Sequence, residues 1–166
     1  PTAADPSTSS EALSILQKYR LPIPSAITAW LKNPVSETPK PGDSRLCNND
    51  YRIIASARHS LEAAARQAQQ AGFNTLLLGD DISGESRDVA REHAVLALTI
   101  AKGNGPVSPP CIILSGGETT VTVRGDGKGG RNGEYLLALA NSLRGTPGIY
   151  ALAADTDGID GAGDNA

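Results

Sequence analysis

Short apolar runs alternate with helix-like segments over residues 51–154 of this 166-residue chain. Each run is too short for a helix and is closed by glycine, serine or aspartate, which is typical of buried strands in a parallel sheet. The segments between the runs place apolar residues at helical spacing. This alternation predicts the α/β class, with strands joined by crossover helices. The predicted strands are Tyr51–Ser56, Thr75–Leu78, Cys111–Leu114 and Ile149–Ala154.

Capping residues set the predicted helix bounds. Ser56 is expected to cap a helix that ends before Gly72, because serine caps helix starts and glycine follows helix ends. The remaining predicted helices are Ser10–Tyr19, Ser25–Leu31, Ser86–Lys102 and Asn132–Leu143. Residues 33–49 are rich in proline and predict an exposed linker. The loop at residues 79–85 is expected to be a plain strand-to-helix connection.

The alternation changes after Cys111–Leu114. Ser115–Glu118 is too short for a crossover helix, so Cys111–Leu114 and Thr119–Val123 are expected to pair as an antiparallel hairpin.

Composition excludes several function classes. The net charge is −3, and no block of lysine and arginine indicates a nucleic-acid surface. No apolar run approaches the roughly 20 residues that cross a bilayer, so no membrane partner is expected. Cys47 and Cys111 match no metal-ligand spacing and are expected to be reduced, as in a cytoplasmic protein.

A basic, glycine-rich loop, Gly125–Arg131, opens the last predicted helix. Glycines at a helix start point free N–H groups at one place, where the helix dipole favours an anion. Lys128 and Arg131 add positive charge, and Arg131 can grip a phosphate or a carboxylate with two hydrogen bonds. The alternative is a solvated glycine turn with two surface cations.

An acidic loop follows the last predicted strand. Asp155, Asp157 and Asp160 alternate with glycines and could hold Mg²⁺, or one of them could take a proton from a substrate hydroxyl. The alternative is a turn whose carboxylates bind their own backbone.

Glu118, after two glycines, is a further candidate for a metal or ribose contact, or else a hairpin-turn residue. His93 falls on an apolar helix face and predicts a packed, hydrogen-bonded core histidine, whereas His59 is expected near a helix start in solvent. Neither has a nucleophile partner, so a serine or cysteine triad is not expected.

The spacing Gly125-x-Gly127-x-x-Gly130 also matches the dinucleotide fingerprint formally. That fingerprint belongs to the first turn of a parallel unit, whereas the strand before it here is expected in a hairpin. A nicotinamide-dependent enzyme is therefore the second interpretation.

Two motifs carry a family resemblance. SGGETTVTVRGDGKGGRNGE, residues 115–134, and ALAADTDGIDG, residues 151–161, resemble the signature of the type II glycerate kinases, whose C-terminal part is the MOFRL domain. DPSTSSEALSILQKYRLPIP, ETPKPGD and IIASARHSLEAAA resemble the second half of that family's N-terminal domain. The resemblance implies a three-layer βαβ part of a Rossmann-like domain over residues 1–106. Residues 107–166 would begin a mixed α/β MOFRL-type domain.

The resemblance also implies an activity: phosphorylation of D-glycerate at its 2-hydroxyl with ATP and Mg²⁺, in a cleft between two domains. Family members are often labelled hydroxypyruvate reductases, particularly in tartrate degradation, and a homodimer is one expected assembly. The implied catalytic residues are Arg131, which matches the family's GGRN arginine, and Asp157. The candidate metal ligands, from the chemistry of the acidic loop, are Asp155, Asp157 and Asp160. The residues implied in cofactor binding are Gly116, Gly117, Glu118, Gly127, Lys128, Gly129, Gly130 and Asn132.

The sequence departs from the family pattern at Gly133, where glutamine is usual, and at Ala57, where asparagine is frequent. The family's functional lysine early in its N-terminal domain has no counterpart here. The chain holds no methionine and stops inside a loop, so we expect an internal fragment that is inactive alone. The alternatives left open are an NAD(P)H-dependent hydroxypyruvate reductase and a non-catalytic nucleotide- or metabolite-binding module.

Overall fold

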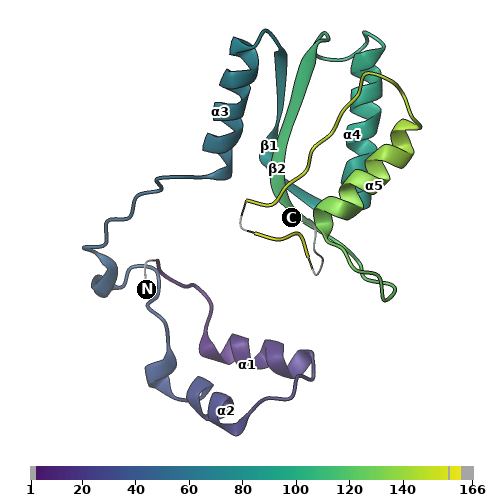
Figure 1. The fold of residues 1–166 in the computed structure, drawn as a ribbon. Helices are drawn as coiled ribbons and strands as arrows, with labels where there is room; N and C mark the ends of the chain where they lie inside the picture. The colour runs from purple at the N-terminus through teal and green to yellow at the C-terminus, as the bar shows by residue number, and fades with distance from the viewer. Residues whose placement is uncertain (1–2, 157, 162–166) are drawn as a thin grey trace. The chain divides into compact units, whose positions relative to one another are not determined.

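The structure is a computed structural model that describes residues 3–156 and 158–161. It divides into two compact units, Pro1–Ile54 and Ala55–Ala166. Figure 1 draws the elements of both. The elements of the first unit are α1 (Ser9–Lys18), α2 (Ser25–Leu31) and the 3₁₀ turns η1 (Pro34–Ser36) and η2 (Ser44–Leu46).

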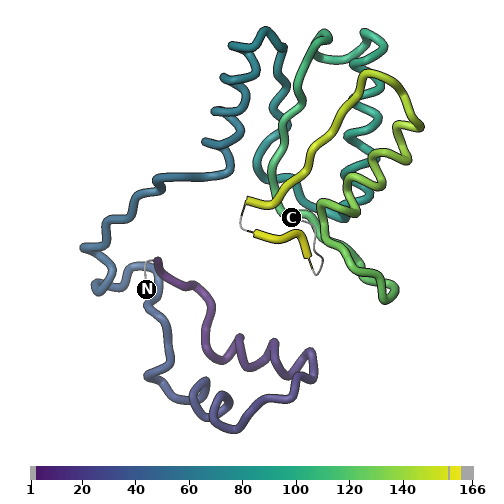
Figure 2. Tube along the Cα trace, in the orientation of Figure 1, coloured from purple at the N-terminus to yellow at the C-terminus, as the bar shows by residue number. Residues whose placement is uncertain are grey.

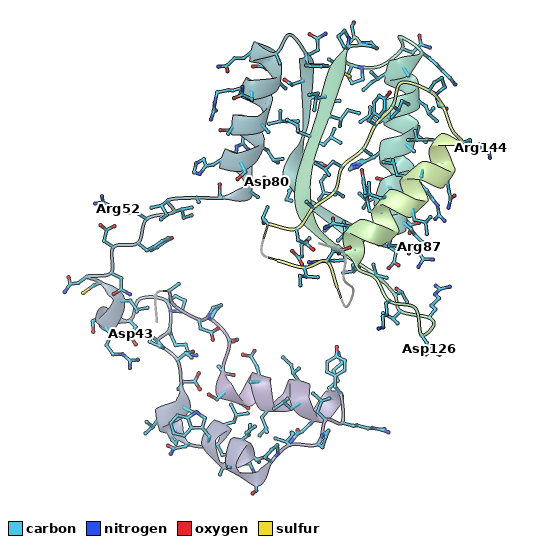
Figure 3. All side chains as sticks on the ribbon, in the orientation of Figure 1. Asp43, Arg52, Asp80, Arg87, Asp126 and Arg144 are labelled. Atoms are coloured by element: carbon cyan, nitrogen blue, oxygen red, sulfur yellow. The ribbon has the colours of Figure 1, made fainter. Side chains whose placement is uncertain are left out.

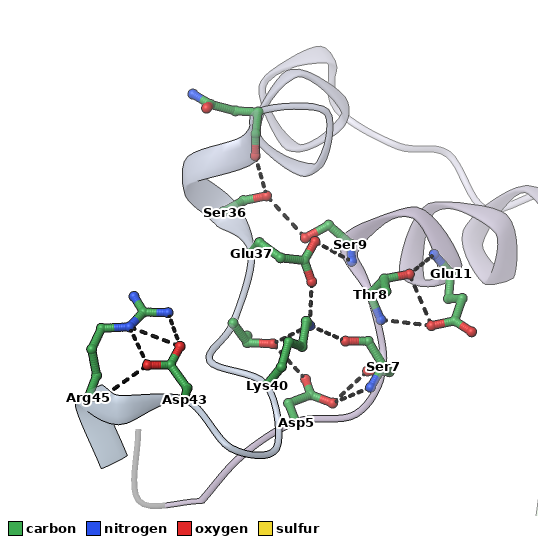
Figure 4. Close-up of polar contacts among 12 residues, drawn as sticks. Asp5, Ser7, Thr8, Ser9, Glu11, Ser36, Glu37, Lys40, Asp43 and Arg45 are labelled. Carbon is green, nitrogen blue, oxygen red and sulfur yellow. Dashed lines mark hydrogen bonds and ion pairs between the residues drawn. The ribbon is translucent and has the colours of Figure 1, made fainter. Parts of the chain in front are cut away.

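Polar contacts tie the start of the first unit to residues 36–40 (Figure 4). Thr8 and Glu11 form a capping box at the start of α1. The Glu37 carboxylate accepts the Ser9 backbone N–H at 3.2 Å and pairs with Lys40. The stretch predicted as an exposed linker therefore folds back on the N-terminal segment in this region.

The second unit carries the sheet. Its elements are α3 (Ala57–Gln70), β1 (Asn74–Glu85), α4 (Ser86–Ala101), β2 (Cys111–Thr120) and α5 (Arg131–Leu143). In the described residues β1 and β2 form a two-stranded parallel sheet. α3 lies on one side of the strands, and α4 and α5 lie on the other (Figure 1). The predicted α/β class with a parallel sheet is confirmed.

The core of this unit lies between α4 and α5. Its buried side chains come from Ala90 and Ala94 on α4 and from Leu139 and Leu143 on α5. The small alanines let the two helices approach closely, and the leucines fill the space between them. This packing fixes the direction of α5, whose first turn holds the candidate site.

His93 is the packed, hydrogen-bonded histidine that its position predicted. Its Nδ1 lies 2.8 Å from the Tyr135 hydroxyl, and the two rings meet edge to face. The contact joins α4 to α5. Burial holds the pKa of His93 below its usual value of 6.5. His59 is exposed near the start of α3, also as predicted.

We expect this histidine to give the protein a pH-dependent stability. The folded pKa is depressed, so below pH 6.5 the unfolded state binds more protons and the free energy of unfolding falls. Replacing His93 with phenylalanine should remove that part of the slope. Thermal unfolding of the full-length protein between about pH 5 and pH 7.5 measures it. The exposed-residue control, His59→Phe, should keep the slope, and an unchanged slope in His93→Phe would contradict the assignment.

The predicted antiparallel hairpin is wrong. β2 runs without a turn from Cys111 to Thr120 and pairs in parallel with β1, so that Glu85 lies opposite Thr120. The expected loop at residues 79–85 is likewise the second half of β1. A register shift near Gly79 lets the strands continue, and Gly117 lies against the Ile82 backbone where a Cβ would collide. Glycine permits this close approach.

Two further predicted strands are also wrong. Residues 51–56 and 149–154 form no strand in the structure, and Ile54 and Tyr150 are each 94% exposed. Figure 2 shows both segments as extended stretches of chain. A strand needs a hydrogen-bonded neighbour, and in the described part of the chain the sheet contains β1 and β2. Thr75–Leu78 and Cys111–Leu114 are strands as predicted, although they are half-buried and Leu77 is exposed.

Candidate active site

Three segments meet at the carboxyl ends of the strands around Arg131, the first residue of α5. The Arg131 guanidinium pairs through Nη1 with the Glu118 carboxylate of β2, and its Nη2 lies 3.6 Å from Asp155 Oδ1. The Asp155 side chain is 16% exposed and that of Glu118 is 80% exposed. We call Glu118, Arg131, Asp155 and Asp160 the Arg131 cluster. The structure thus brings together candidates from three separate sequence motifs.

Asp160 joins this cluster as the cap of α5. Gly130, the residue before the helix, offers no side chain to cap it. The Asp160 carboxylate instead accepts the Asn132 backbone N–H at 3.1 Å and the Gly133 N–H at 2.8 Å. The first turn of α5 was expected to receive a phosphate. In the structure a carboxylate of the chain itself takes that position.

Glycines make this contact sterically possible. A Cβ at Gly130 would collide with the Asp160 carboxylate and backbone. Gly161 has φ +67°, a left-handed conformation that favours glycine, and a Cβ there would collide with the Gly129 carbonyl. Gly130 and Gly161 therefore let the acidic loop cross the start of α5 at backbone distance. Gly133, in contrast, has room for a side chain, as a Cβ would lie 3.6 Å from Asp160 Oδ2.

The structure does not bring the rest of the basic loop to the cluster. Gly127, Lys128 and Gly129 are exposed, and no partner of the Lys128 ammonium is found among the described residues. Figure 3 labels Asp126 at the far end of this loop, away from the strand ends. A phosphate site that includes Lys128 would require the loop to move toward Arg131.

The glycines on β2 have neighbours of their own. A Cβ at Gly116 would lie 3.4 Å from Leu61 Cδ1 of α3, and Gly117 lies against β1. Both residues allow close packing of the strand. Their expected contact with a cofactor stays a prediction.

The described residues do not fit a Mg²⁺ site held by the protein. Among them no group of three or more His, Cys, Asp or Glu side chains could hold a metal ion. Asp155 faces a guanidinium, and both Asp160 oxygens accept backbone N–H groups. Asp157, expected as base or metal ligand, lies outside the described residues. The metal assignment therefore stays a prediction.

Sequence reasoning missed a second ionic group next to the cluster. The Arg87 guanidinium lies 3.3 Å from Glu85 Oε1 at the end of β1 and 3.3 Å from Glu134 Oε1 on α5. Figure 3 labels Arg87 near the start of α5. Glu85 also accepts the Thr122 N–H and hydroxyl, both at 3.0 Å, and these hydrogen bonds lower the pKa of its carboxyl. The run Glu85-Ser86-Arg87, which joins a strand end to a helix start, could have indicated this ionic group in the sequence.

Asn132, like Arg87, has a side-chain atom that is orphaned within the described part of the chain. Its side-chain nitrogen is buried without a hydrogen-bond partner there. An unsatisfied buried donor is costly, so such a group is often completed by a ligand or a water molecule. Asn132 directly follows Arg131, and together they offer several N–H donors to an anionic ligand.

Comparisons with known proteins agree with the family resemblance. Residues 111–166 match the model of the MOFRL family. A protein of Agrobacterium vitis named "Putative hydroxypyruvate reductase" is 44% identical over the whole chain. The D-glycerate 2-kinase of Thermotoga maritima is 32% identical. The chain covers 37% and 38% of these two proteins, so it spans about two fifths of the relatives' length.

Comparison with solved structures also finds a glycerate kinase. The crystal structure of glycerate kinase from Thermotoga maritima matches 96% of this chain with a TM-score of 0.74 and 32% identity, over 37% of its own chain. The predicted resemblance to the type II glycerate kinases of the MOFRL family is confirmed. None of the helices in the described residues is long and apolar enough to span a bilayer.

Proposed function

We propose that this chain is part of an enzyme that transfers the γ-phosphoryl group of ATP to the 2-hydroxyl of D-glycerate. The observation that carries the proposal is the position of Arg131. It lies at the carboxyl ends of the strands, between Glu118 and Asp155, in the part of the chain that matches the MOFRL model. Ligands of open α/β sheets bind at this end. Relatives named glycerate 2-kinase from Thermotoga maritima and Pyrococcus horikoshii support the choice of substrate.

In this proposal Arg131 binds the carboxylate of D-glycerate or the transferring phosphoryl group. A guanidinium donates two parallel hydrogen bonds to either anion. Glu118 pairs with Arg131 in the structure but is 80% exposed, so it can swing into solvent when a ligand arrives. The buried Asn132 amide donates a further hydrogen bond to the same ligand.

A carboxylate of the acidic loop takes the proton of the substrate hydroxyl. The hydroxyl oxygen forms a bond to the γ-phosphorus, the bond to the β,γ-bridging oxygen breaks, and ADP leaves. Asp155 is the described candidate because it lies 3.6 Å from the Arg131 guanidinium. Asp157 is the other candidate.

For ATP, we propose that the exposed loop at residues 125–130 closes over the phosphates. Its glycines would offer N–H groups, and Lys128 would neutralise charge. Mg²⁺ would arrive bound to the nucleotide, as it commonly does with phosphate substrates. The described residues do not fit a site for the free ion, so we assign it no step. The domain boundary at residues 106 and 107, the homodimer and the cytoplasmic location stay predictions.

The site of transfer is tested by identifying the product. The full-length protein is incubated with D-glycerate and MgATP, and the product is separated by chromatography. We expect 2-phosphoglycerate. Exclusive formation of 3-phosphoglycerate would contradict the assigned acceptor hydroxyl.

A nicotinamide-dependent reductase of hydroxypyruvate is the second candidate. It is favoured by the name of the Agrobacterium vitis relative and by the spacing Gly125-x-Gly127-x-x-Gly130. Against it, the fingerprint needs a free helix start for the pyrophosphate, and Asp160 takes the start of α5. NADPH binding, read from nicotinamide fluorescence, distinguishes this candidate from the kinase. A non-catalytic module would bind ATP or a hydroxy acid without turnover.

A further inference from the structure

The Asp160 carboxylate is buried, and both of its oxygens accept hydrogen bonds from the backbone of α5. The residue is 8% exposed, and its two oxygens accept two consecutive N–H groups of the first turn of α5. The partners lie 27 and 28 residues earlier in the sequence. The contact therefore joins the acidic loop to α5 over a long distance in sequence, unlike a local turn. We call these two hydrogen bonds of Asp160, to Asn132 and Gly133, the clamp.

A role as a metal ligand fits this geometry poorly. Both Asp160 oxygens already accept backbone N–H groups, and among the described residues no group of three or more His, Cys, Asp or Glu side chains could hold a metal ion. A Cβ at Gly130 would collide with the Asp160 carboxylate, and a Cβ at Gly161 would collide with the backbone of Gly129 and Gly130. Glycine at both positions therefore makes the clamp sterically possible.

The clamp holds the two groups that the proposed reaction uses. Arg131 is the first residue of α5, the helix that Asp160 caps. Asp155 belongs to the same acidic loop as Asp160 and lies 3.6 Å from the Arg131 guanidinium. Asp160 thus ties the loop that carries Asp155 to the helix that carries Arg131.

We propose that Asp160 is a positioning residue that locks the acidic loop onto the start of α5 and so sets the spacing between Arg131 and Asp155. The kinetic part of this inference rests on the proposed kinase function. A consequence is that the ligand's anionic group is held by the side chain of Arg131, because the helix start itself is taken.

The test compares Asp160→Asn with Asp160→Ala in the full-length protein. Asparagine keeps one acceptor oxygen for the N–H groups of α5, where aspartate has two, and it is a weaker ligand for Mg²⁺. We expect Asp160→Ala to lower kcat/KM for D-glycerate roughly 10²-fold, as a misplaced catalytic group does, and to lower Tm by about 2–4 °C. Asp160→Asn should recover part of both losses, because its amide oxygen can still accept one of the two N–H groups. The Mg²⁺ concentration for half-maximal rate should stay unchanged in both variants.

Two further measurements separate positioning from a general loss of stability. In an Asp160→Ala background, adding Arg131→Ala should cost far less than it does alone, because the two residues act on one contact. The matched control is Asp88→Ala, which removes an exposed acid from the first turn of α4 and should change neither kcat nor KM. If Asp160→Ala does not fold, Asp160→Asn and Asp160→Ser, both capping residues, replace it.

Four results would overturn the inference. Asp160→Asn as inactive as Asp160→Ala, with a raised Mg²⁺ requirement, would make Asp160 a metal ligand. A lowered Tm with unchanged kcat and KM would leave a purely structural cap, and additive losses with Arg131→Ala would do the same. If the unmodified enzyme shows no turnover of glycerate, the proposed function fails, and the clamp is then judged by Tm alone. In that case equal Tm values for Asp160→Ala and the unmodified protein would refute it.

Discussion

Replacing Arg131 with alanine is expected to lower kcat/KM for D-glycerate by roughly 10³-fold in the full-length enzyme. In the proposed reaction Arg131 neutralises the charge of the glycerate carboxylate or of the transferring phosphoryl group. Arg131 is held between β2 and the acidic loop by Glu118 and Asp155, so it meets the ligand with its guanidinium already placed. Preorganised charge of this kind contributes most of the rate enhancement in phosphoryl transfer.

Two variants complete the experiment. Arg131→Lys keeps the charge and loses the two-fold hydrogen-bonding geometry, so its rate should fall between those of the alanine variant and the unmodified enzyme. Arg91→Ala removes an exposed arginine that pairs with Asp88 on the same helix, and it should leave kcat/KM unchanged. Steady-state kinetics on folded, purified protein measures all three. Near-normal kinetics of Arg131→Ala would remove this residue from the mechanism.

Replacing Gly130 with alanine is expected to destabilise the protein by about 1–3 kcal/mol. Gly130 has φ −148°, an extended conformation open to any residue, so the backbone conformation itself adds no strain. The added methyl group would collide with Asp160, which must then leave its two N–H partners on α5. The loss of the cap and the crowding act together.

Gly133→Ala is the matched control, three residues further along. Its Cβ would make an ordinary contact of 3.6 Å with Asp160 Oδ2, and the residue lies inside α5. Alanine is favoured over glycine in a helix by about 0.5–1 kcal/mol, so this variant should be slightly more stable. Thermal unfolding of the two variants and of the unmodified protein measures these differences in stability. A Gly130→Ala protein as stable as Gly133→Ala would show that the acidic loop does not cross the helix start as described.

The helices could be predicted closely from the sequence because their ends depend on local residues. α2 has the predicted bounds, and α3 is capped by Ser56 and followed by Gly72 at φ +86° as expected. A cap needs only residues three or four positions apart, so neighbouring sequence contains the necessary information.

The strands were harder to predict because pairing is decided by distant residues. The short gap at Ser115–Glu118 suggested a turn, yet β2 continues straight through it because β1 offers backbone partners as far as Glu85. Residues 51–56 have the same apolar character and form no strand in the structure. Apolar character alone does not tell a paired segment from an unpaired one.

The candidate site was predicted in part. The positions of Glu118, Arg131 and Asp155 after apolar runs indicated the strand ends, and the structure brings the three together. The role of Asp160 could not be predicted, since its partners lie on a helix far away in the sequence. Arg87 was missed because its carboxylate partners, Glu85 and Glu134, come from two different elements.

Turnover of D-glycerate by the full-length protein tests the central proposal most directly. ADP release is measured with MgATP in the presence and absence of D-glycerate, beside oxidation of NADH or NADPH with hydroxypyruvate. We predict ADP release that depends on D-glycerate and no oxidation of the nicotinamide. Oxidation of NADH or NADPH without ADP release would contradict the kinase and favour a dinucleotide site at Gly125–Gly130.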